Sequence, residues 1–366
     1  MRLAIIAPPW VPVPPPAYGG TETVLDALAR ALVVSGHDVL LYATGDSTSP
    51  VPTRWARPLA AGTVATGSAT ELHHVVNAYE AVIDWGAEIV HDHTLVGPLY
   101  APRFGVPVVT TNHGPFEGEL FDYYRAIAHT VPVIALSRHH ASTAGDIPVA
   151  AVINHGVDLA AFPFGRGDGG YALFLGRMSP DKGVHTAVSV ARAAGVPLRI
   201  AAKMREPAEQ RYFEERVRPL LGAGVEYVGE VGGTAKLELL ARATCLLNPI
   251  EWNEPFGMVM IEALACGTPV VATPRGSAPE IVLHGATGYL AAGEASLVEA
   301  VGRAGELDRR RCRADVAERF SSRRMAADHV ALYERVAARR RPRTPTIEVG
   351  RGGRRPEPLG AAQLAS

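Results

Sequence analysis

Short apolar runs and amphipathic stretches alternate along the first half of the chain. Residues 3–7 form an apolar run typical of a buried strand, and residues 21–35 place their apolar side chains on one face of a helix. Residues 37–43 supply the next strand, which makes a β-α-β opening. The pattern predicts a further helix over residues 71–85 and further strands over residues 88–91, 106–111, 132–136 and 149–153.

The same alternation resumes after residue 170. It predicts strands over residues 171–175, 198–202, 225–228, 245–248 and 268–273, and helices over residues 184–194, 207–221, 236–243 and 255–266. Strands that alternate with helices favour a parallel sheet with helices on both faces. We therefore expect an α/β protein with two Rossmann-like, doubly wound domains, residues 1–164 and 170–315. The Gly-rich stretch over residues 162–170 has the composition of a hinge.

About the last 70 residues contain a helical pattern followed by a stretch of biased composition. Residues 294 to about 340 have a helical pattern, and we treat residues 316–341 as a separate C-terminal helix. Residues 342–366 are rich in Pro, Gly and Arg, which predicts a disordered tail. The basic run over residues 339–343 is better explained as part of a solvated tail than as a contact with an anionic surface.

Composition limits the function classes. The 366 residues are enough for two domains, and a hydrophobic content of 47% with 20% charged residues is ordinary for a globular protein. A net charge of −1 gives no overall field that would recruit nucleic acid. The three cysteines are widely spaced without a C-x-x-C pair, so we expect free thiols in a reducing compartment, the cytoplasm. The first apolar run is too short for a signal peptide, and no run of about 20 apolar residues predicts a membrane span.

Residues 248–270 are the most informative stretch. Glu262 is the only charge in the apolar run from Pro255 to Cys266, so its carboxylate needs a partner. Pro255 fits the first position of a helix, and the amides of Phe256, Gly257 and Met258 would then face an anion at the helix start. Glu254 and Glu262 would flank that anion and hold hydroxyl groups on either side of a phosphate. The simpler interpretation is one acidic cap and one buried, hydrogen-bonded glutamate.

The segment between the first strand and its helix ends in Gly19 and Gly20. This pair allows a close approach of the backbone to a ligand at the helix start, although a plain turn and cap would explain it equally well. The G-x-G-x-x-G pattern of dinucleotide-binding folds is missing here, which counts against an NAD enzyme.

Histidines follow two predicted strands of the first half. His91 and His93 end one strand and His113 ends the next, at the edge where parallel strands deliver side chains to a crevice. A metal site shared by these rings is conceivable, but no carboxylate or cysteine stands at a convincing spacing, so we expect no metal. The alternative for each histidine is a structural cap.

The loop over residues 176–183 follows the first strand of the second half. It carries Arg177 and Lys182, two cations that suit a diphosphate because arginine binds two oxygens and lysine acts as a point charge. A solvated charged loop is the alternative.

Taken together, four segments resemble the motifs of the retaining family-4 glycosyltransferases of the GT-B fold. They are the Gly19-Gly20 loop, the Thr-Asn-His113-Gly strand end, the Gly-Arg177 to Lys182-Gly loop and the Glu254 to Glu262 pair, in the family's order. The resemblance covers about residues 1 to 335. It implies two domains that face each other across a cleft, with the last helix crossing back to the first domain. It also implies a donor bound mainly by the second domain, an acceptor bound by the first, and transfer with retention and without a divalent metal.

The resemblance also implies individual roles. Glu254 would hold donor-sugar hydroxyls, Glu262 the ribose, and His113 the sugar from the opposite domain. Arg177 and Lys182 would stabilise the leaving diphosphate. The remaining donor-binding candidates are Gly19, Gly20, Val231, Phe256, Gly257, Met258 and Val259, and His93 is a candidate on the acceptor side.

Two segments depart from the family pattern. His155 is inserted before the glycine of Asn154-His155-Gly156-Val157-Asp158, which we interpret as structural. Ala202, Lys203 and Met204 stand where many members carry a Gly-rich turn, so the resemblance does not determine the choice of base and donor sugar.

We therefore predict a glycosyltransferase that moves a sugar from a nucleotide diphosphate sugar to a soluble small-molecule or glycan acceptor. We expect a UDP-sugar or a GDP-sugar as donor, no cofactor and no nucleic acid partner. The helix over residues 71–85 offers only His73 and His74 as basic residues, so a membrane contact is not expected. The alternatives are a nucleotide-sugar epimerase, a pyridoxal-phosphate phosphorylase of the same fold and a non-catalytic nucleotide-sugar-binding protein. High Ala and Arg content is typical of a GC-rich bacterium.

Overall fold

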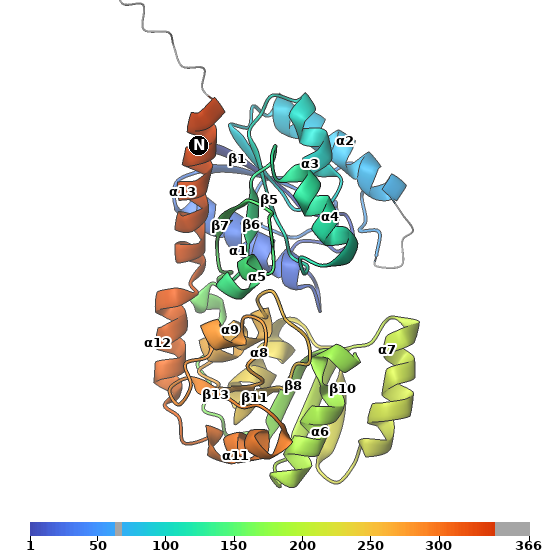
Figure 1. Ribbon diagram of the computed structural model, residues 1–366, viewed down its shortest axis with the longest axis vertical. Coiled ribbons are helices and arrows are strands. Elements are labelled where there is room, and N and C mark those ends of the chain that lie inside the picture. Colours follow the sequence, from blue (N-terminus) through green and yellow to red (C-terminus); the bar gives the residue numbers. More distant parts are fainter. Residues whose placement is uncertain (63–67, 341–366) are drawn as a thin grey trace, which may run out of the picture.

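The computed structural model describes residues 1–62 and 68–340 and shows two α/β domains, one above the other in Figure 1. The predicted tail, residues 342–366, lies outside the described residues. None of the helices in the described ranges is both long enough and apolar enough to cross a bilayer.

The first domain is built on a seven-stranded parallel sheet in the order β3-β2-β1-β4-β5-β6-β7. Its strands are β1 (Arg2–Ile6), β2 (Asp38–Tyr42), β3 (Thr53–Arg54), β4 (Ile89–Asp92), β5 (Val108–Thr111), β6 (Val133–Ala135) and β7 (Val149–Val152). The helices between them are α1 (Gly20–Val34), α2 (Ser68–Asp84), α3 (Gly97–Tyr100), α4 (Gly118–Ile127) and α5 (Arg138–Ser142).

The second domain has a six-stranded parallel sheet in the order β10-β9-β8-β11-β12-β13. The strands are β8 (Ala172–Arg177), β9 (Leu198–Lys203), β10 (Val225–Gly229), β11 (Cys245–Asn248), β12 (Val270–Ala272) and β13 (Gly288–Leu290). The helices are α6 (Val184–Ala193), α7 (Pro207–Tyr212), α8 (Gly233–Arg242), α9 (Met258–Ala265), α10 (Ala278–Ile281), α11 (Glu294–Ala304) and α12 (Arg309–Arg319). The prediction of two doubly wound parallel sheets is confirmed.

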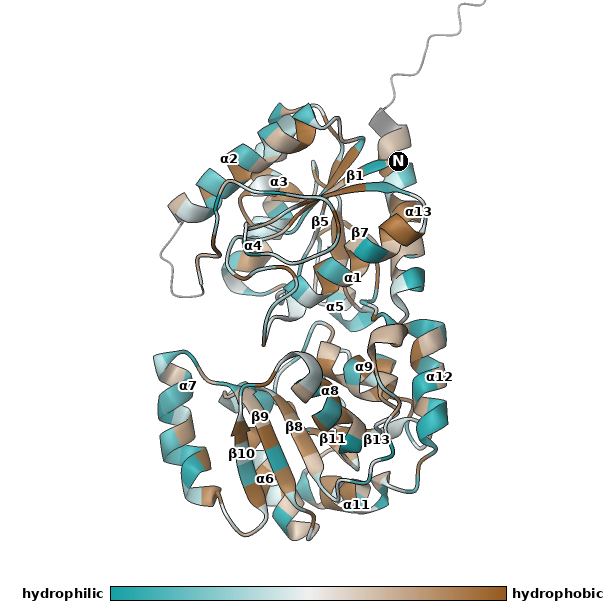
Figure 2. Ribbon diagram, turned by 180° about the vertical axis from the view of Figure 1, so that it is seen from behind, coloured by the Kyte–Doolittle hydropathy of each residue, from teal (hydrophilic) through white to brown (hydrophobic). Residues whose placement is uncertain are grey.

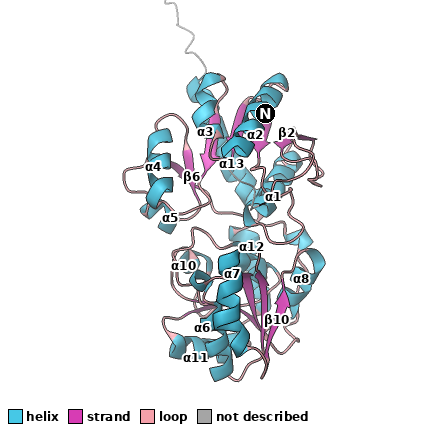
Figure 3. Ribbon diagram, turned by 90° about the vertical axis from the view of Figure 1, so that its right-hand side faces the viewer, coloured by secondary structure: helices cyan, strands magenta, loops and turns pink. Residues whose placement is uncertain are grey.

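Helices cover both faces of each sheet, as the side view in Figure 3 shows. This explains why the strands are apolar on both sides: in β1, Leu3 to Ile6 are all buried. One face of the first sheet packs against α1 and the other against α2. In Figure 2 the strands of the second domain are brown while the outer faces of α7 and α12 carry teal, polar positions.

The last helix, α13 (Ser322–Arg340), returns to the first domain and lies alongside it in Figure 1. Its Met325 and Tyr333 are buried in the same core as α1. The guanidinium of Arg324 donates to the carbonyl oxygens of Asn154 and His155, at 2.7 and 2.9 Å. The helix α13 therefore packs on the domain that contains β1 and links the second domain back to it.

The two domains also touch directly beside the cleft. The hydroxyl of Ser137 in the first domain donates to the carbonyl oxygen of Pro255 in the second, at 2.8 Å. The amides of Arg138 and His139 at the start of α5 donate to the carboxylate of Glu280 at 3.0 and 2.7 Å. These contacts hold the segment before α9 and the helix α10 against the first domain.

Some local predictions were wrong in detail. The helix predicted over residues 207–221 is α7 followed by a π turn at Phe213–Val217 and a 3-10 turn at Arg218–Leu220, where Pro219 lacks the amide that would continue an α-helix.

The Gly-rich stretch 162–170 is packed against the second domain. A Cβ at Gly165 would lie 1.9 Å from the carbonyl oxygen of Ala241, so this glycine serves a close backbone approach.

Candidate functional site

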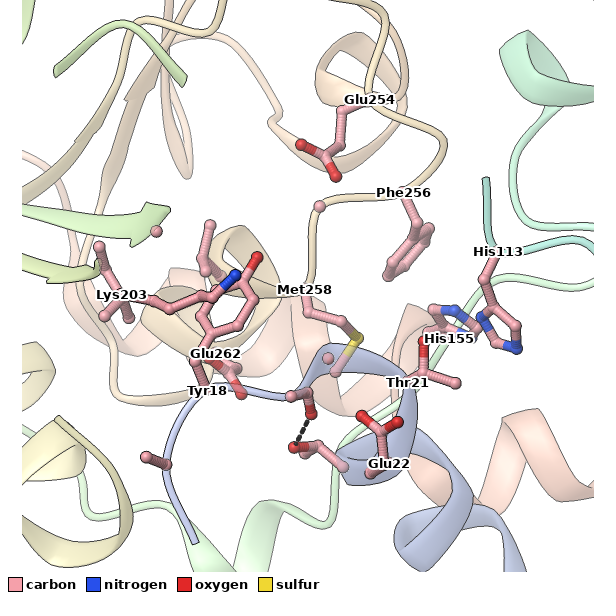
Figure 4. A pocket seen from close by; sticks show the side chains of 18 of the residues that line it. Tyr18, Thr21, Glu22, His113, His155, Lys203, Glu254, Phe256, Met258 and Glu262 are labelled. Atoms are coloured by element: carbon pink, nitrogen blue, oxygen red, sulfur yellow. Dashed lines mark hydrogen bonds between the residues drawn. The ribbon is translucent and has the colours of Figure 1, made fainter. Parts of the chain in front are cut away.

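A cavity of about 670 Å³ lies between the domains, where loops at the carboxyl ends of both sheets face each other. Figure 4 shows the helix α1 on one side of the cavity and the loop before α9 on the other. The predicted site residues that line it are Gly19, Gly20, His113, Lys182, Val231, Glu254, Phe256, Gly257, Met258, Val259 and Glu262. Residues from distant parts of the sequence are thus brought to one place.

The helix that carries Glu262 begins later than predicted. We expected Pro255 at its first position, but α9 starts at Met258, with Gly257 as its cap at φ 82°. The preceding residues are held out of the helix because the carbonyl oxygens of Pro255 and Phe256 accept hydrogen bonds from the hydroxyls of Ser137 and Ser277. The amides that open toward the cavity are therefore those of Met258 and Val259 in the first turn of α9.

Glu254 is held between a cation and an indole. Its Oε2 accepts hydrogen bonds from the ammonium of Lys182 and from Nε1 of Trp252, the latter at 3.1 Å. The Lys182 ammonium also lies 4.8 Å from the centre of the Trp252 ring. The side chains of Lys182 and Glu254 are 12% and 19% exposed, and both residues line the cavity.

Glu262 has the charged partner that its buried position requires. Its Oε1 accepts a hydrogen bond from the ammonium of Lys236 at 2.8 Å, and its side chain is 5% exposed. Lys236 lies in α8 and was not among the predicted site residues. The sequence signal that could have identified Lys236 is the small number of lysines. The chain has only Lys182, Lys203 and Lys236, and all three line the cavity.

Lys203, at the end of β9, is a further lining residue that the sequence analysis did not assign. It is 6% exposed, and its ammonium donates to Glu206 and Glu209 at 2.9 and 3.2 Å. Arg205 also lines the cavity and pairs with Glu230 of the next loop. Both cations are thus paired with carboxylates of the second domain.

The loop before α1 reaches across to the second domain. The amide of Tyr18 donates to Glu230 Oε1 at 3.1 Å, and a Cβ on Gly232 would lie 2.3 Å from the carbonyl oxygen of Pro16. Tyr18 lines the cavity, where burial raises the pKa of its phenol to about 12. Gly19 and Gly20 follow directly, so the glycine pair is part of the cavity wall.

His113 belongs to a group of buried imidazoles. Its Nε2 lies 2.9 Å from Nδ1 of His93, and its ring stacks on His155 with 5.5 Å between centroids. Burial lowers the pKa of His113 to about 4 and holds the pKa of His93 and His155 well below the usual value, so these rings are neutral at pH 7. His93 does not line the cavity, and it lies behind His113 rather than facing a ligand.

The deeper histidines are hydrogen-bonded to protein groups. His91 contacts the Tyr333 hydroxyl through Nδ1 and Thr111 through Nε2, at 2.7 and 2.8 Å. Within residues 1–62 and 68–340, no group of three or more His, Cys, Asp or Glu is arranged as metal ligands.

Arg177 stands at the margin of the site. Its guanidinium pairs with Asp181 at 3.0 Å and is 37% exposed, and it is not among the lining residues. It is close enough to Tyr18 for its charge to lower the pKa of that phenol against the stronger effect of burial. A ligand in the cavity would meet Lys182 first.

Comparison with known proteins agrees with this architecture. The glycosyltransferase family 4 model matches residues 18–161 and the glycosyl transferases group 1 model matches residues 162–319. The chain is 30% identical to the alpha-maltose-1-phosphate synthase of Mycolicibacterium smegmatis, over 92% of this chain and all of the relative.

Solved structures show the same fold. AviGT4, a glycosyltransferase involved in avilamycin A biosynthesis, superposes with a TM-score of 0.72 at 27% identity, over 92% of this chain and 98% of that one. HepE from Anabaena, solved in complex with UDP and glucose, superposes with a TM-score of 0.71 at 17% identity, over 92% and 100% of the two chains.

Proposed function

Because the chain belongs to the family-4 group 1 glycosyltransferases, we propose that it moves a sugar from a nucleotide diphosphate sugar to a soluble hydroxyl acceptor with retention and without a divalent metal. The observation that carries this proposal is the second-domain wall of the cavity. There the Lys182–Glu254 pair, the first turn of α9 and the Lys236–Glu262 pair all line the same cavity.

This wall suits each part of the donor. The amides of Met258 and Val259 and the ammonium of Lys182 would bind the diphosphate, since helix starts and lysines are common anion sites. Glu262 would take the ribose hydroxyls, and Glu254 would take the sugar hydroxyls. The HepE structure holds UDP and glucose, which supports a UDP-sugar as the first donor to test.

Charge in the cavity supports a reaction without a divalent metal. As the bond to the diphosphate breaks, negative charge develops on the leaving phosphate, and fixed positive groups lower that barrier. Lys182 would supply this charge together with the start of α9, and Arg177 would add a weaker field from the margin of the site.

Retention would follow from attack on the face from which the diphosphate departs. In that pathway a leaving phosphate oxygen accepts the proton of the acceptor hydroxyl, so no residue serves as a covalent nucleophile. His113 would bind the sugar from the first domain as a neutral imidazole, and closure of the two domains would exclude water.

The test is thermal unfolding with UDP, GDP, ADP and dTDP and their sugars, each with and without EDTA. One nucleotide family should raise the midpoint, since a ligand at about 100 times its Kd adds about 2.7 kcal/mol, and EDTA should leave this shift unchanged. The anomeric configuration of the product, read by NMR coupling constants, then decides between retention and inversion. Loss of binding and turnover in EDTA, restored by Mg²⁺, would overturn metal independence.

The epimerase and binding-protein alternatives are not favoured by the family matches. A pyridoxal-phosphate phosphorylase would be a coloured protein, which an absorption spectrum checks. Cys245, Cys266 and Cys312 are buried free thiols, which supports a reducing compartment and our proposal of the cytoplasm.

A further inference from the structure

The two walls of the cavity differ in charge. The second domain contributes four lining cations, Lys182, Lys203, Arg205 and Lys236, and two lining carboxylates, Glu254 and Glu262, each of which pairs with a lysine. Among the described residues, the first domain contributes Glu22 and Glu71 to the lining and no lysine or arginine. Whatever binds against the first domain therefore meets carboxylates.

Glu22 is a buried carboxylate without a cation. It lies in the first turn of α1, lines the cavity and is 7% exposed. Its carboxylate accepts a hydrogen bond from its own backbone amide, and no Lys, Arg or His of the described chain lies within 4.0 Å of it. Burial raises the pKa of this carboxyl group. Figure 4 shows its side chain pointing from α1 toward Met258, on the opposite side of the cavity from Glu254.

Glu71 adds a second negative group to the same wall. Its Oε1 accepts hydrogen bonds from the amides of Leu95 and Val96, at 2.5 and 3.3 Å, and no cation of the described residues pairs with it. Behind it lies Asp92, fully buried, whose pKa burial raises to about 6 while the field of Glu71 acts in the same direction. Among the described lining residues, the first-domain wall therefore has no lysine or arginine to balance an anionic ligand. The backbone amides at the start of α1 are partly positive, and the carboxylate of Glu22 lies in that same turn.

A buried carboxylate discriminates strongly between ligand charges. It gains from a hydroxyl or ammonium group that donates a hydrogen bond, and it repels a phosphate or carboxylate at short range in a water-poor site. We propose that the first-domain wall is an acceptor subsite for a polyhydroxy compound without an anionic group, a sugar or a cyclitol, and that Glu22 accepts a hydrogen bond from one of its hydroxyls. This inference rests on the proposed function, because it assigns the acceptor of that reaction.

Donor binding tests the orientation of Glu22 without any acceptor. Titration of the preferred nucleotide sugar is compared in wild type, Glu22→Gln and Glu80→Gln, the last an exposed glutamate on α2 as control. The Kd should stay within about threefold in both variants. A change of tenfold or more in Glu22→Gln alone, in either direction, would show that Glu22 faces the donor and would overturn the inference.

Acceptor turnover tests the charge preference. Nucleotide release is measured with neutral, amino and phosphorylated forms of the same rings, such as glucose, glucosamine and glucose 6-phosphate, or inositol and inositol phosphate. The neutral or amino form should exceed its phosphorylated form in kcat/KM by about 100-fold, and Glu22→Gln should lower kcat/KM for that acceptor at least tenfold while Glu80→Gln does not. Preference for the phosphorylated form, or full activity of Glu22→Gln, would exclude this subsite.

The two levels of the proposal fail differently. A wild-type protein that binds no nucleotide sugar would overturn the proposed function and the acceptor assignment with it. A protein that binds the donor, releases nucleotide and prefers an anionic acceptor would overturn the acceptor assignment alone.

Discussion

Nδ1 of His93 lies 2.9 Å from Nε2 of His113, so the ring that faces the cavity is oriented by a second ring buried behind it. Both imidazoles are neutral because burial lowers their pKa values, and one must therefore donate to the other. This contact fixes which nitrogen of His113 is left for a ligand.

Removing that contact should reduce turnover. We expect His93→Leu to lower kcat about tenfold, because His113 loses the hydrogen bond that orients it, and His93→Asn to restore most of the rate, because an amide can take the place of Nδ1. Steady-state kinetics with pH profiles and a melting curve for each variant make the measurement. Equal kcat and an unchanged pH profile in the leucine variant would show that His93 only fills space.

Lys182 lines the cavity, and we propose that its ammonium stabilises the leaving diphosphate. Its replacement by alanine should lower kcat by about 100-fold or more, since one donor aimed at developing negative charge is typically worth that much. Arg310→Ala, an exposed cation on α12, serves as the matched control and should keep the wild-type rate. Wild-type turnover in Lys182→Ala would refute the role.

The Lys236–Glu262 pair should matter for stability as well as for binding. Lys236→Met leaves the 5% exposed carboxylate of Glu262 without its cation and should destabilise the fold by about 3 kcal/mol. The double variant with Glu262→Gln should recover part of this loss. For comparison, Arg218→Met breaks an exposed pair with Glu214 and should cost less than about 1 kcal/mol. Chemical denaturation measures all three variants.

Buried histidines predict a loss of stability in mild acid. Burial lowers the pKa values of His74, His113 and His329 to about 4, below the ordinary value of 6.5. Below about pH 6.5 the unfolded chain binds protons that the folded protein does not, so unfolding becomes easier as the pH falls toward 4. Asp92, with its pKa raised to about 6, and Glu22, whose pKa burial also raises, act in the opposite direction but are fewer than the buried histidines.

We expect the melting temperature to be lower at pH 5 than at pH 7.5 by roughly 5 °C or more. His329→Asn should show a shallower dependence, because one of the titrating rings is removed. A melting temperature that stays constant or rises over this range would contradict the assignment of these rings as neutral.

The fold could be predicted because its signal is local and repeated. Each strand is an apolar run and each long helix has an apolar face, so the order of elements follows from the pattern. The start of α9 could not be predicted in this way. It depends on the Ser137 hydroxyl, which binds the Pro255 carbonyl oxygen at 2.8 Å from 118 residues away.

The site residues likewise divide into those that stand in sequence motifs and those whose partners are distant in the sequence. Lys182 and Glu254 stand in motifs and were found, whereas Lys203 and Lys236 gain meaning only from partners brought close by the fold. Glu22 lies next to the glycine pair, yet only its burial without a cation distinguishes it from a surface residue of a first helical turn.

All three lysines of the protein line one cavity, so a reagent that modifies lysine side chains can react only there. Amine-reactive crosslinkers, biotinylation reagents and sensor-chip coupling would find, among its side chains, only those of the cavity, besides the N-terminal amine. Immobilisation through a lysine should therefore inactivate the molecule, whereas attachment through the N-terminal amine, an engineered cysteine or a terminal tag should not. A nucleotide that carries an aldehyde would in turn label this cavity selectively, and the labelled peptide would identify the lysine that it reached.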